Sequence, residues 1–466
     1  MRGLLSMAWR SAWHRRFSLT LVVLAMALST LLLLSVERLR HDVKQNFRDA
    51  VSGTDLIVGA RTAPVQLLLH SVFRIGNATQ AIRMDSLRAL ERDRAVAWVV
   101  PIALGDTYRG FPVVGTTSAY FEHFRYGQRR SLSVEQGRLF KAVDQAHGEG
   151  DRQPGRHAGP HEGRDRKHDH DHDHDHDHDH EGTHQEGVFK AVIGAEVAQR
   201  LGLQPGASLE LRHGQGDLDA HDHADKPFIV VGVLARTGTP VDRSVHVPLQ
   251  GIEALHLDWV AGVPVPGRSI PAEQALEHDL SPRKVTAALV GLKSRAAVFA
   301  VQRRVAEFEG EPLMAAMPAV ALDELWGMLD WVEQALRLMG ALVALVSVAG
   351  LVAVVVSTLD QRRRELAILR SVGAGPRRVV ALLLVEGLML SGVGALVGLV
   401  AWWLGLVLGG PWIAARWGLN ISVGWPQAAE WVLLAAVVAS GTVASLVPAW
   451  RAYRISLADG LAPRGA

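Results

Sequence analysis

The chain has 466 residues, a formal net charge of +2 and no cysteine. Without cysteine, disulfides, thiolate zinc sites, iron–sulfur clusters and cysteine nucleophiles are excluded, so any metal site must use histidine and carboxylate ligands. The near-neutral charge argues against a nucleic-acid binder held by a basic face. The number that stands out is 21 histidines.

Four apolar stretches contain no Asp, Glu, Lys or Arg. They are residues 17–36, 338–359, 387–415 and 431–450. Each is long enough to cross a bilayer, which takes about 20 mainly apolar residues. The first stretch follows two arginines, as a signal peptide would, but it is longer than the usual apolar region of about 7 to 15 residues and lacks a small-x-small cleavage site. We therefore expect an uncleaved anchor.

Arginines predict the orientation, because basic residues in short segments resist translocation. They gather before the first stretch, between the second and third, and after the fourth, whereas the turn between the third and fourth has only Arg416. This pattern predicts that both termini are cytoplasmic. By the same logic, residues 37–337 lie outside.

The predicted fold class is a membrane protein with four transmembrane α-helices and a large mixed α/β extracytoplasmic domain inserted between helices 1 and 2. The predicted segments are a cytoplasmic leader (1–16), span 1 (17–36), the external domain (37–337), span 2 (338–359), a cytoplasmic loop (360–378), span 3 (379–410), an external turn (411–430), span 4 (431–450) and a cytoplasmic tail (451–466).

Within the external domain, apolar runs bounded by turn residues predict strands. They lie at 55–60, 97–104, 111–116, 228–234, 244–249 and 286–292. Helical patterns fall at 82–92, 195–201 and 296–308. The size of the domain and the number of strands suggest two subdomains.

An insert over residues 144–187 is poor in apolar residues and cannot pack a core. Its centre is a strict His–Asp alternation, and a second His–Asp cluster follows in the turn after the strand-like residues 208–212. Imidazole and carboxylate suit Zn, Ni or Cu(II). We expect divalent metal binding there, and a solvated low-complexity loop remains the alternative. The candidate ligands are His168, His170, His172, His174, His176, His178, His180, His184, His221 and His223.

Residues 180–184 read HEGTH and satisfy the zinc-protease pattern H-E-x-x-H. That chemistry needs both histidines on one face of a helix, and here Gly182 weakens a helix at the end of a histidine repeat. We interpret the match as chance. No G-x-x-x-x-G-K-[ST] phosphate-binding loop occurs, so we expect no enzymatic activity in this chain.

Residues 361–386 read QRRRELAILRSVGAGPRRVVALLLVE. Leu366, Ile368 and Leu369 supply apolar contacts on a predicted short helix, Gly373 breaks it, and Pro376 can start the next helix. An amphipathic helix in a cytoplasmic loop suits docking to another protein. A basic loop that lies on lipid headgroups is the alternative.

These residues resemble the C-terminal half of FtsX/MacB-type ABC transporter permeases, as does the ending SLVPAWRAYRISLADGL. Residues 189–203 and 227–249 resemble the extracytoplasmic core domain of the MacB type. The order of elements, one span, a large domain and three spans, is similar as well. The two His–Asp loops depart from the family pattern and read as additions.

The resemblance implies a permease in the bacterial cytoplasmic (inner) membrane, without a required cofactor, that works as a dimer with a separate cytoplasmic ATPase. Partners would be that ATPase, a second permease copy or paralogue, membrane lipid and a periplasmic adaptor. ATP-driven closure of the dimer would move the external domain. The segment that would contact the ATPase consists of Arg362, Arg363, Arg364, Glu365, Leu366, Ile368, Leu369 and Arg370.

The third span would help to form the dimer contact. Gly394 with Gly398, and Gly405 with Gly409, form two G-x-x-x-G pairs that suit close helix packing. The abundance of glycine in membrane helices is the alternative reason for these pairs. Glu386 near the inner edge of the span is a candidate polar contact or an interfacial carboxylate.

Three functions remain open. The first is export or extraction of a peptide, drug, lipid or lipoprotein, which the size of the external domain favours. The second is transmembrane signalling to an external partner, with nothing transported. The third is a metal-linked transport component regulated by zinc or nickel on the His–Asp loops.

Overall fold

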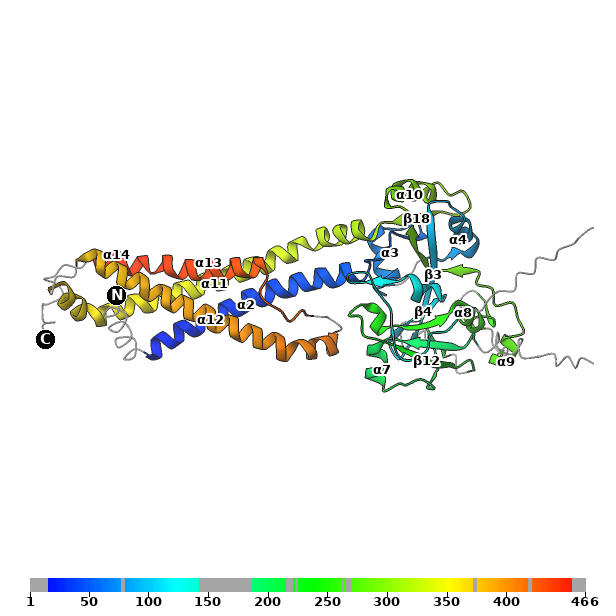
Figure 1. Ribbon diagram of the computed structural model, residues 1–466, viewed down its shortest axis with the longest axis horizontal. Helices are drawn as coiled ribbons and strands as arrows, with labels where there is room; N and C mark the ends of the chain where they lie inside the picture. The colour runs from blue at the N-terminus through cyan, green and yellow to red at the C-terminus, as the bar shows by residue number, and fades with distance from the viewer. Residues whose placement is uncertain are drawn as a thin grey trace, which may run out of the picture. The chain divides into compact units, whose positions relative to one another are not determined.

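The computed structural model describes residues 16–76, 80–141, 187–214, 221–222, 225–260, 263–264, 270–371, 375–417 and 421–454. The chain forms two compact units. One consists of Met1–Asp49 together with Leu322–Ala466, and the other consists of Ala50–Ala321. Figure 1 shows that the first unit is built of long helices and the second of strands and short helices.

Long apolar helices form the first unit, which we call the helical unit. They are α2 (Arg16–Asp49), α11 (Pro318–Ser371), α12 (Pro376–Trp417), α13 (Ala428–Ala444) and α14 (Leu446–Arg454). Within the described residues they give four candidate membrane spans, because α13 and α14 together make up the fourth. A helix satisfies all its backbone polar groups internally, which the bilayer requires. The four predicted transmembrane helices are confirmed.

Two of these helices are longer than their apolar stretches. α2 continues to Asp49, and α11 begins at Pro318, so both extend into the region assigned to the external domain by its charges. The short helix predicted in the cytoplasmic loop is not a separate helix. Its residues form the C-terminal end of α11 and are continuous with the membrane span, and α12 begins at Pro376 as predicted.

An ion pair ties α2 to the start of α13. The Arg38 guanidinium donates to both carboxylate oxygens of Glu430, at 2.8 and 2.9 Å, and both side chains are almost fully buried. It also donates to Ser422 Oγ at 3.1 Å, and it lies 5.1 Å from the centre of the Trp402 ring. Two parallel charge-assisted hydrogen bonds fix the geometry of the pair. Its position therefore holds the loop after α12 against α2.

A second polar cluster joins α2 to α11. Glu333 on α11 accepts hydrogen bonds from Arg40 and, at 2.8 Å, from Lys44 Nζ, both on α2. One turn away on α11, Arg337 also donates to Glu333, at 2.8 Å. Beyond this cluster, the rings of Phe47 and Trp326 meet edge to face at 5.4 Å. The two helices are thus fastened to one another where they leave the apolar stretches.

The second unit, which we call the external unit, is organised by one long strand path. Its order is β18-β1-β17-β3-β4-β13-β8-β12-β7. The strands are β1 (Leu56–Ala60), β2 (Ile82–Arg83), β3 (Val96–Tyr108), β4 (Phe111–Thr116), β5 (Arg125–Tyr126), β6 (Arg130–Ser131), β7 (Val134–Gly137), β8 (Lys190–Ile193), β9 (Ser208–Leu209), β10 (Arg212–His213), β11 (His221–Asp222), β12 (Phe228–Leu234), β13 (Val245–Pro248), β14 (Trp259–Val260), β15 (Val263–Pro264), β16 (Lys284–Val285), β17 (Ala287–Leu292) and β18 (Leu313–Ala316).

Short helices cover this path. They are α3 (Pro64–Ser71), α4 (Met84–Glu91), α5 (Ala119–His123), α7 (Ala195–Leu201), α8 (Leu249–Leu255), α9 (Ala272–Ala275) and α10 (Val298–Ala306), with 3₁₀ turns at η1 (Pro240–Arg243) and η2 (Arg295–Ala297). In Figure 1, α4 and α10 lie near β18 at one end of the unit, and α7 lies near β12 at the other.

The strand β3 is shared by two hydrophobic cores. Its first half pairs antiparallel with β17, and its second half pairs antiparallel with β4. One core gathers side chains such as Val58, Val290 and Val301. The other gathers Val113, Val230 and Val245. The predicted division into two subdomains therefore corresponds to two cores within one compact unit, joined by a 13-residue strand.

The predicted strands at 111–116 and 228–234 are observed as β4 and β12 with the same bounds. The strand predicted at 244–249 ends one residue earlier, because Pro248 precedes the first turn of α8. β3 is longer than predicted, since a register shift between Leu104 and Thr107 lets it continue past Gly105 to Tyr108.

Asp93 connects α10 to the turn after α4. Its carboxylate accepts hydrogen bonds from Arg304 Nε at 2.7 Å, from Arg304 Nη2 at 3.0 Å and from the backbone N–H of Ala95 at 2.9 Å. Burial opposes ionisation of Asp93, but these hydrogen bonds outweigh it and hold the pKa of Asp93 below its ordinary value. The ion pair therefore stabilises the folded external unit when Asp93 is charged.

We expect Asp93→Asn to lower the free energy of unfolding of the external unit by about 1 kcal/mol at pH 7. The folded-state pKa is depressed, so this stabilisation is present above the unfolded value of about 3.9 and is lost as the pH falls below it. Urea unfolding of the purified chain in detergent at pH 7 and pH 3 measures both effects. Glu307→Gln is the matched control, because it removes an exposed ion pair with Arg303, the neighbour of Arg304 on α10. An Asp93→Asn deficit that is equal at the two pH values would contradict the assignment.

Candidate functional site

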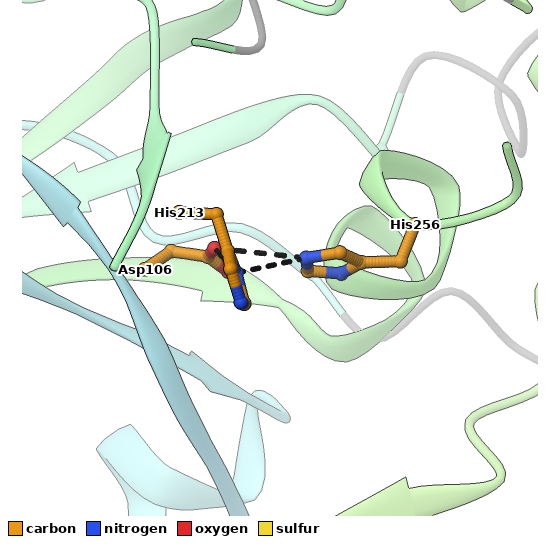
Figure 2. Close-up of side chains that lie close together, drawn as sticks. All are labelled: Asp106, His213 and His256. Carbon is orange, nitrogen blue, oxygen red and sulfur yellow. Dashed lines mark hydrogen bonds and ion pairs between the residues drawn. The ribbon is translucent and has the colours of Figure 1, made fainter. Parts of the chain in front are cut away.

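Three side chains with metal-ligand chemistry meet in the external unit. Asp106 comes from β3, His213 from β10 and His256 from the residue that follows α8. One ligand atom from each lies within 4.8 Å of the others, and within the described residues this is the group that meets that criterion. Figure 2 shows the two imidazoles converging on the Asp106 carboxylate. We call this group the Asp–His–His cluster.

Local backbone geometry brings Asp106 and His213 together. β10 pairs antiparallel with β3 so that His213 lies directly opposite Asp106. Asp106 lies within the register shift between Leu104 and Thr107, and Gly105 in the same shift has φ of 155°, which L side chains rarely adopt. Bulges of this kind turn a side chain out of the regular alternation of a strand. Here the bulge presents Asp106 to His213.

A hydrogen bond to the backbone of α8 orients the His256 ring. Its Nδ1 lies 2.9 Å from the carbonyl oxygen of Ile252, one turn earlier in α8. A carbonyl oxygen only accepts, so Nδ1 is the donor in this hydrogen bond, and in a neutral ring with this tautomer Nε2 is the acceptor nitrogen. That Nε2 lies 3.2 Å from His213 Nδ1 and 3.7 Å from Asp106 Oδ1.

The third distance of the triangle, from His213 Nδ1 to Asp106 Oδ1, is 2.8 Å. The Asp106 side chain is only 4% exposed, whereas the His213 and His256 side chains are 34% and 25% exposed. The indole of Trp259 packs edge to face against both imidazoles, with centroids 4.8 Å from His213 and 5.1 Å from His256. The cluster is therefore anchored on a buried carboxylate and open on the imidazole side.

The hydrogen bond to Asp106 raises the pKa of His213, and burial acts against this shift. Both Asp106 Oδ1 and His256 Nε2 can accept, so the space between them attracts one positive charge. A proton on His213 Nδ1 or a divalent cation bound to all three atoms can supply it.

The predicted metal ligands His168, His170, His172, His174, His176, His178, His180, His184 and His223 lie outside the described residues and stay predictions. The HEGTH match at 180–184 lies outside them as well. His221 is in β11, at the register position opposite His213. Sequence reasoning missed Asp106 and His256. They are separated from His213 by 107 and 43 positions, so no spacing motif could reveal the cluster.

The predicted packing glycines occupy two different environments on α12. A Cβ on Gly394 would lie 2.6 Å from Met26 Cβ, and a Cβ on Gly398 would lie 2.5 Å from the carbonyl oxygen of Ala27. Both contacts are with α2 of the same chain. A Cβ on Gly405 or Gly409 would meet nothing within 4 Å. Glu386 lies on the same helix and is half-buried.

We expect Gly398→Ala to destabilise the helical unit by about 1 to 3 kcal/mol, because the backbone of α2 would have to move away from the added methyl group. Gly405→Ala on the same helix is the matched control and should be nearly neutral. Thermal unfolding of the two variants in a mild detergent measures the difference. Equal stability of the two variants would show that α2 and α12 do not approach closely at Gly398.

The helical unit, with its four membrane spans, defines a multi-pass membrane protein that carries an external domain. Residues 337–457 match the family model described as "FtsX-like permease C-terminal". This match confirms the predicted resemblance to FtsX-like permeases over residues 337–457, which contain the second, third and fourth membrane spans.

Two solved structures are similar to the chain at low identity. The periplasmic region of MacB from Actinobacillus actinomycetemcomitans is 9% identical, and the match covers 60% of this chain and 97% of that one with a TM-score of 0.30. The extracellular domain of the noncanonic ABC-type transporter YknZ from Gram-positive bacteria is 12% identical, with coverages of 56% and 98% and a TM-score of 0.28. Both TM-scores lie below 0.5, so these likenesses do not define the fold of the external unit. A search of curated proteins finds no match.

Proposed function

We propose that this permease transmits the ATP cycle of a separate cytoplasmic ATPase to its external unit, and that the resulting movement exports or extracts a substrate. The match of residues 337–457 to the FtsX-like permease family is the observation that carries the proposal. The ATPase would be a separate subunit, since the sequence of this chain has no phosphate-binding loop of the Walker type.

The continuity of α11 supports a mechanical link. Its 54 residues run from Pro318 to Ser371 and include both the predicted ATPase-contacting segment at 362–370 and the second membrane span. At about 1.5 Å per residue, such a helix is about 80 Å long. A displacement at its cytoplasmic end is therefore carried through the membrane without passing through a loop.

The fastening of α11 to α2 supports the same link. These are the two helices through which the chain enters and leaves the external unit. Glu333 pairs with Arg40 and Lys44 across them, and Lys44 Nζ also lies 5.5 Å from the centre of the Trp326 ring. Two helices that are joined by ion pairs move together more readily than two helices without such contacts.

A second permease, either another copy or a paralogue, would complete the assembly. The described part of α12 offers a face for it, since Gly405 and Gly409 have open space around them and the residues just before them, Leu404 and Leu408, are exposed. Small residues let two membrane helices approach closely. Lipid covers this face if no second permease does. The proposed assembly also includes a periplasmic adaptor.

Signalling to an external partner is the alternative use of the same movement. A transported substrate and a signalled partner are separated by a transport assay, because only the first function depletes substrate on one side of the membrane. The Asp–His–His cluster favours a metal-linked variant of the transport function over one that is independent of metal.

The test replaces Glu365 and Leu366 with alanine in the predicted ATPase-contacting segment. We expect the ATPase to remain active alone but to lose about tenfold or more of the stimulation that the permease gives it, and to copurify less well. ATP hydrolysis by the purified complex in nanodiscs measures this loss. Asp330→Ala, an exposed position on the same helix, is the matched control. Undiminished stimulation and copurification would overturn the assignment of this segment.

A further inference from the structure

We propose that the Asp–His–His cluster is a binding site for a divalent transition-metal ion of the zinc class. The site is built by three elements of the external unit and contains no residue of the His–Asp insert. It extends the proposed transport function, which does not require it.

The distances between the three ligand atoms fit a zinc ion. Zn–N bonds of about 2.0 to 2.1 Å in tetrahedral geometry place neighbouring ligands about 3.3 Å apart. The three edges of the triangle are 2.8, 3.2 and 3.7 Å, which bracket that separation. Small side-chain rotations suffice to place one ion at bonding distance from all three atoms. Three protein ligands leave one position for water or another donor.

The donor set selects the class of metal. Two imidazoles and one carboxylate suit Zn, Co, Ni and Cu ions, whereas Mg and Ca prefer oxygen ligands. The buried Asp106 carboxylate supplies the negative charge, and each imidazole can offer one ring nitrogen as a ligand. A divalent ion would neutralise a carboxylate that is almost fully withdrawn from water.

Groups around the cluster already orient its ligands. In zinc sites, a ligating histidine usually donates its second N–H to a carbonyl or carboxylate, which fixes the ring and its tautomer. His256 does this through Nδ1 and the carbonyl oxygen of Ile252. Thr107, next to Asp106, donates its hydroxyl to the carbonyl oxygen of Gly214, next to His213, at 3.1 Å. The backbone of the two strands is thus fixed on both sides of the ligand pair.

His213 lies in the part of the sequence that is richest in histidine. Fourteen of the 21 histidines lie between His147 and His223. β11 returns antiparallel to β10 and places residue 221 opposite residue 213. A second histidine therefore shares the strand pair that carries one of the three ligands.

A stability measurement separates this site from the His–Asp insert. An ion that binds only the folded protein stabilises it by mass action, whereas an ion that binds a segment equally in the folded and unfolded states does not. The Asp–His–His cluster exists only when β3, β10 and α8 are in place. Zinc bound there must therefore raise the unfolding temperature of the external unit.

The experiment uses the full-length chain in detergent, stripped of metal by chelation and then titrated with ZnCl₂. We expect the unfolding temperature of the wild-type external unit to rise by about 5 °C at a 100-fold excess of zinc over its dissociation constant. Asp106→Asn, His213→Ala and His256→Ala should lose most of that rise. His278→Ala, an exposed histidine whose Nδ1 bonds only within its own turn, should keep it. His256→Ala leaves the Asp106–His213 pair in place, so it tests the site if the other variants fold poorly.

Cobalt provides a second readout at the same site. Tetrahedral Co²⁺ gives visible absorption bands, and it quenches a nearby indole such as Trp259, so the quenched signal should disappear in Trp259→Phe. Absence of a zinc-dependent temperature rise in the wild type would overturn the proposal. An equal rise in the three ligand variants would also overturn it, and so would a rise that is lost only on deletion of residues 144–187.

Discussion

The chain runs between the helical unit and the external unit through α2 and α11, and the Glu333 carboxylate holds these two helices together. It accepts from Arg40 and Lys44 on one helix while Arg337 packs against it on the other. Three cations surround one carboxylate, and the edge-to-face contact of Phe47 with Trp326 also joins the two helices. A movement of α11 at this level would therefore be shared with α2.

Physical patterns in the sequence predicted the membrane part well. Runs of about 20 residues without charge are sufficient evidence for a span, because an unpaired charge in lipid is costly. They did not predict where the helices end. Glu37, Arg38 and Arg40 read as the start of a soluble domain, yet they continue α2. The charges of Arg38 and Arg40 are matched by Glu430 and Glu333, almost 300 residues or more away. Long-range pairing of this kind leaves no local signal.

In the external unit, too, local sequence predicted some features and missed those that depend on long-range contacts. Continuous apolar runs such as 111–116 and 228–234 predicted strands with the correct bounds, because a buried strand is apolar along its length. The Asp–His–His cluster was not predicted. Asp106 lies in a bulge, His213 belongs to a two-residue strand and His256 follows a short helix, so the site arises from sheet register and not from spacing. The histidine excess indicated metal chemistry and includes His213, but it gave no signal for Asp106 or His256.

The central claim is that the ATP cycle reaches the external unit through α2 and α11. Hydrogen–deuterium exchange on the reconstituted permease–ATPase complex tests it most directly, by comparison of the nucleotide-free and ATP-trapped states. The account predicts that ATP trapping changes exchange together in residues 40–49 of α2 and 318–337 of α11, and that Glu333→Ala removes the change on α2 while leaving the cytoplasmic end of α11 responsive. A response confined to the cytoplasmic end of α11 in the wild-type complex would contradict it.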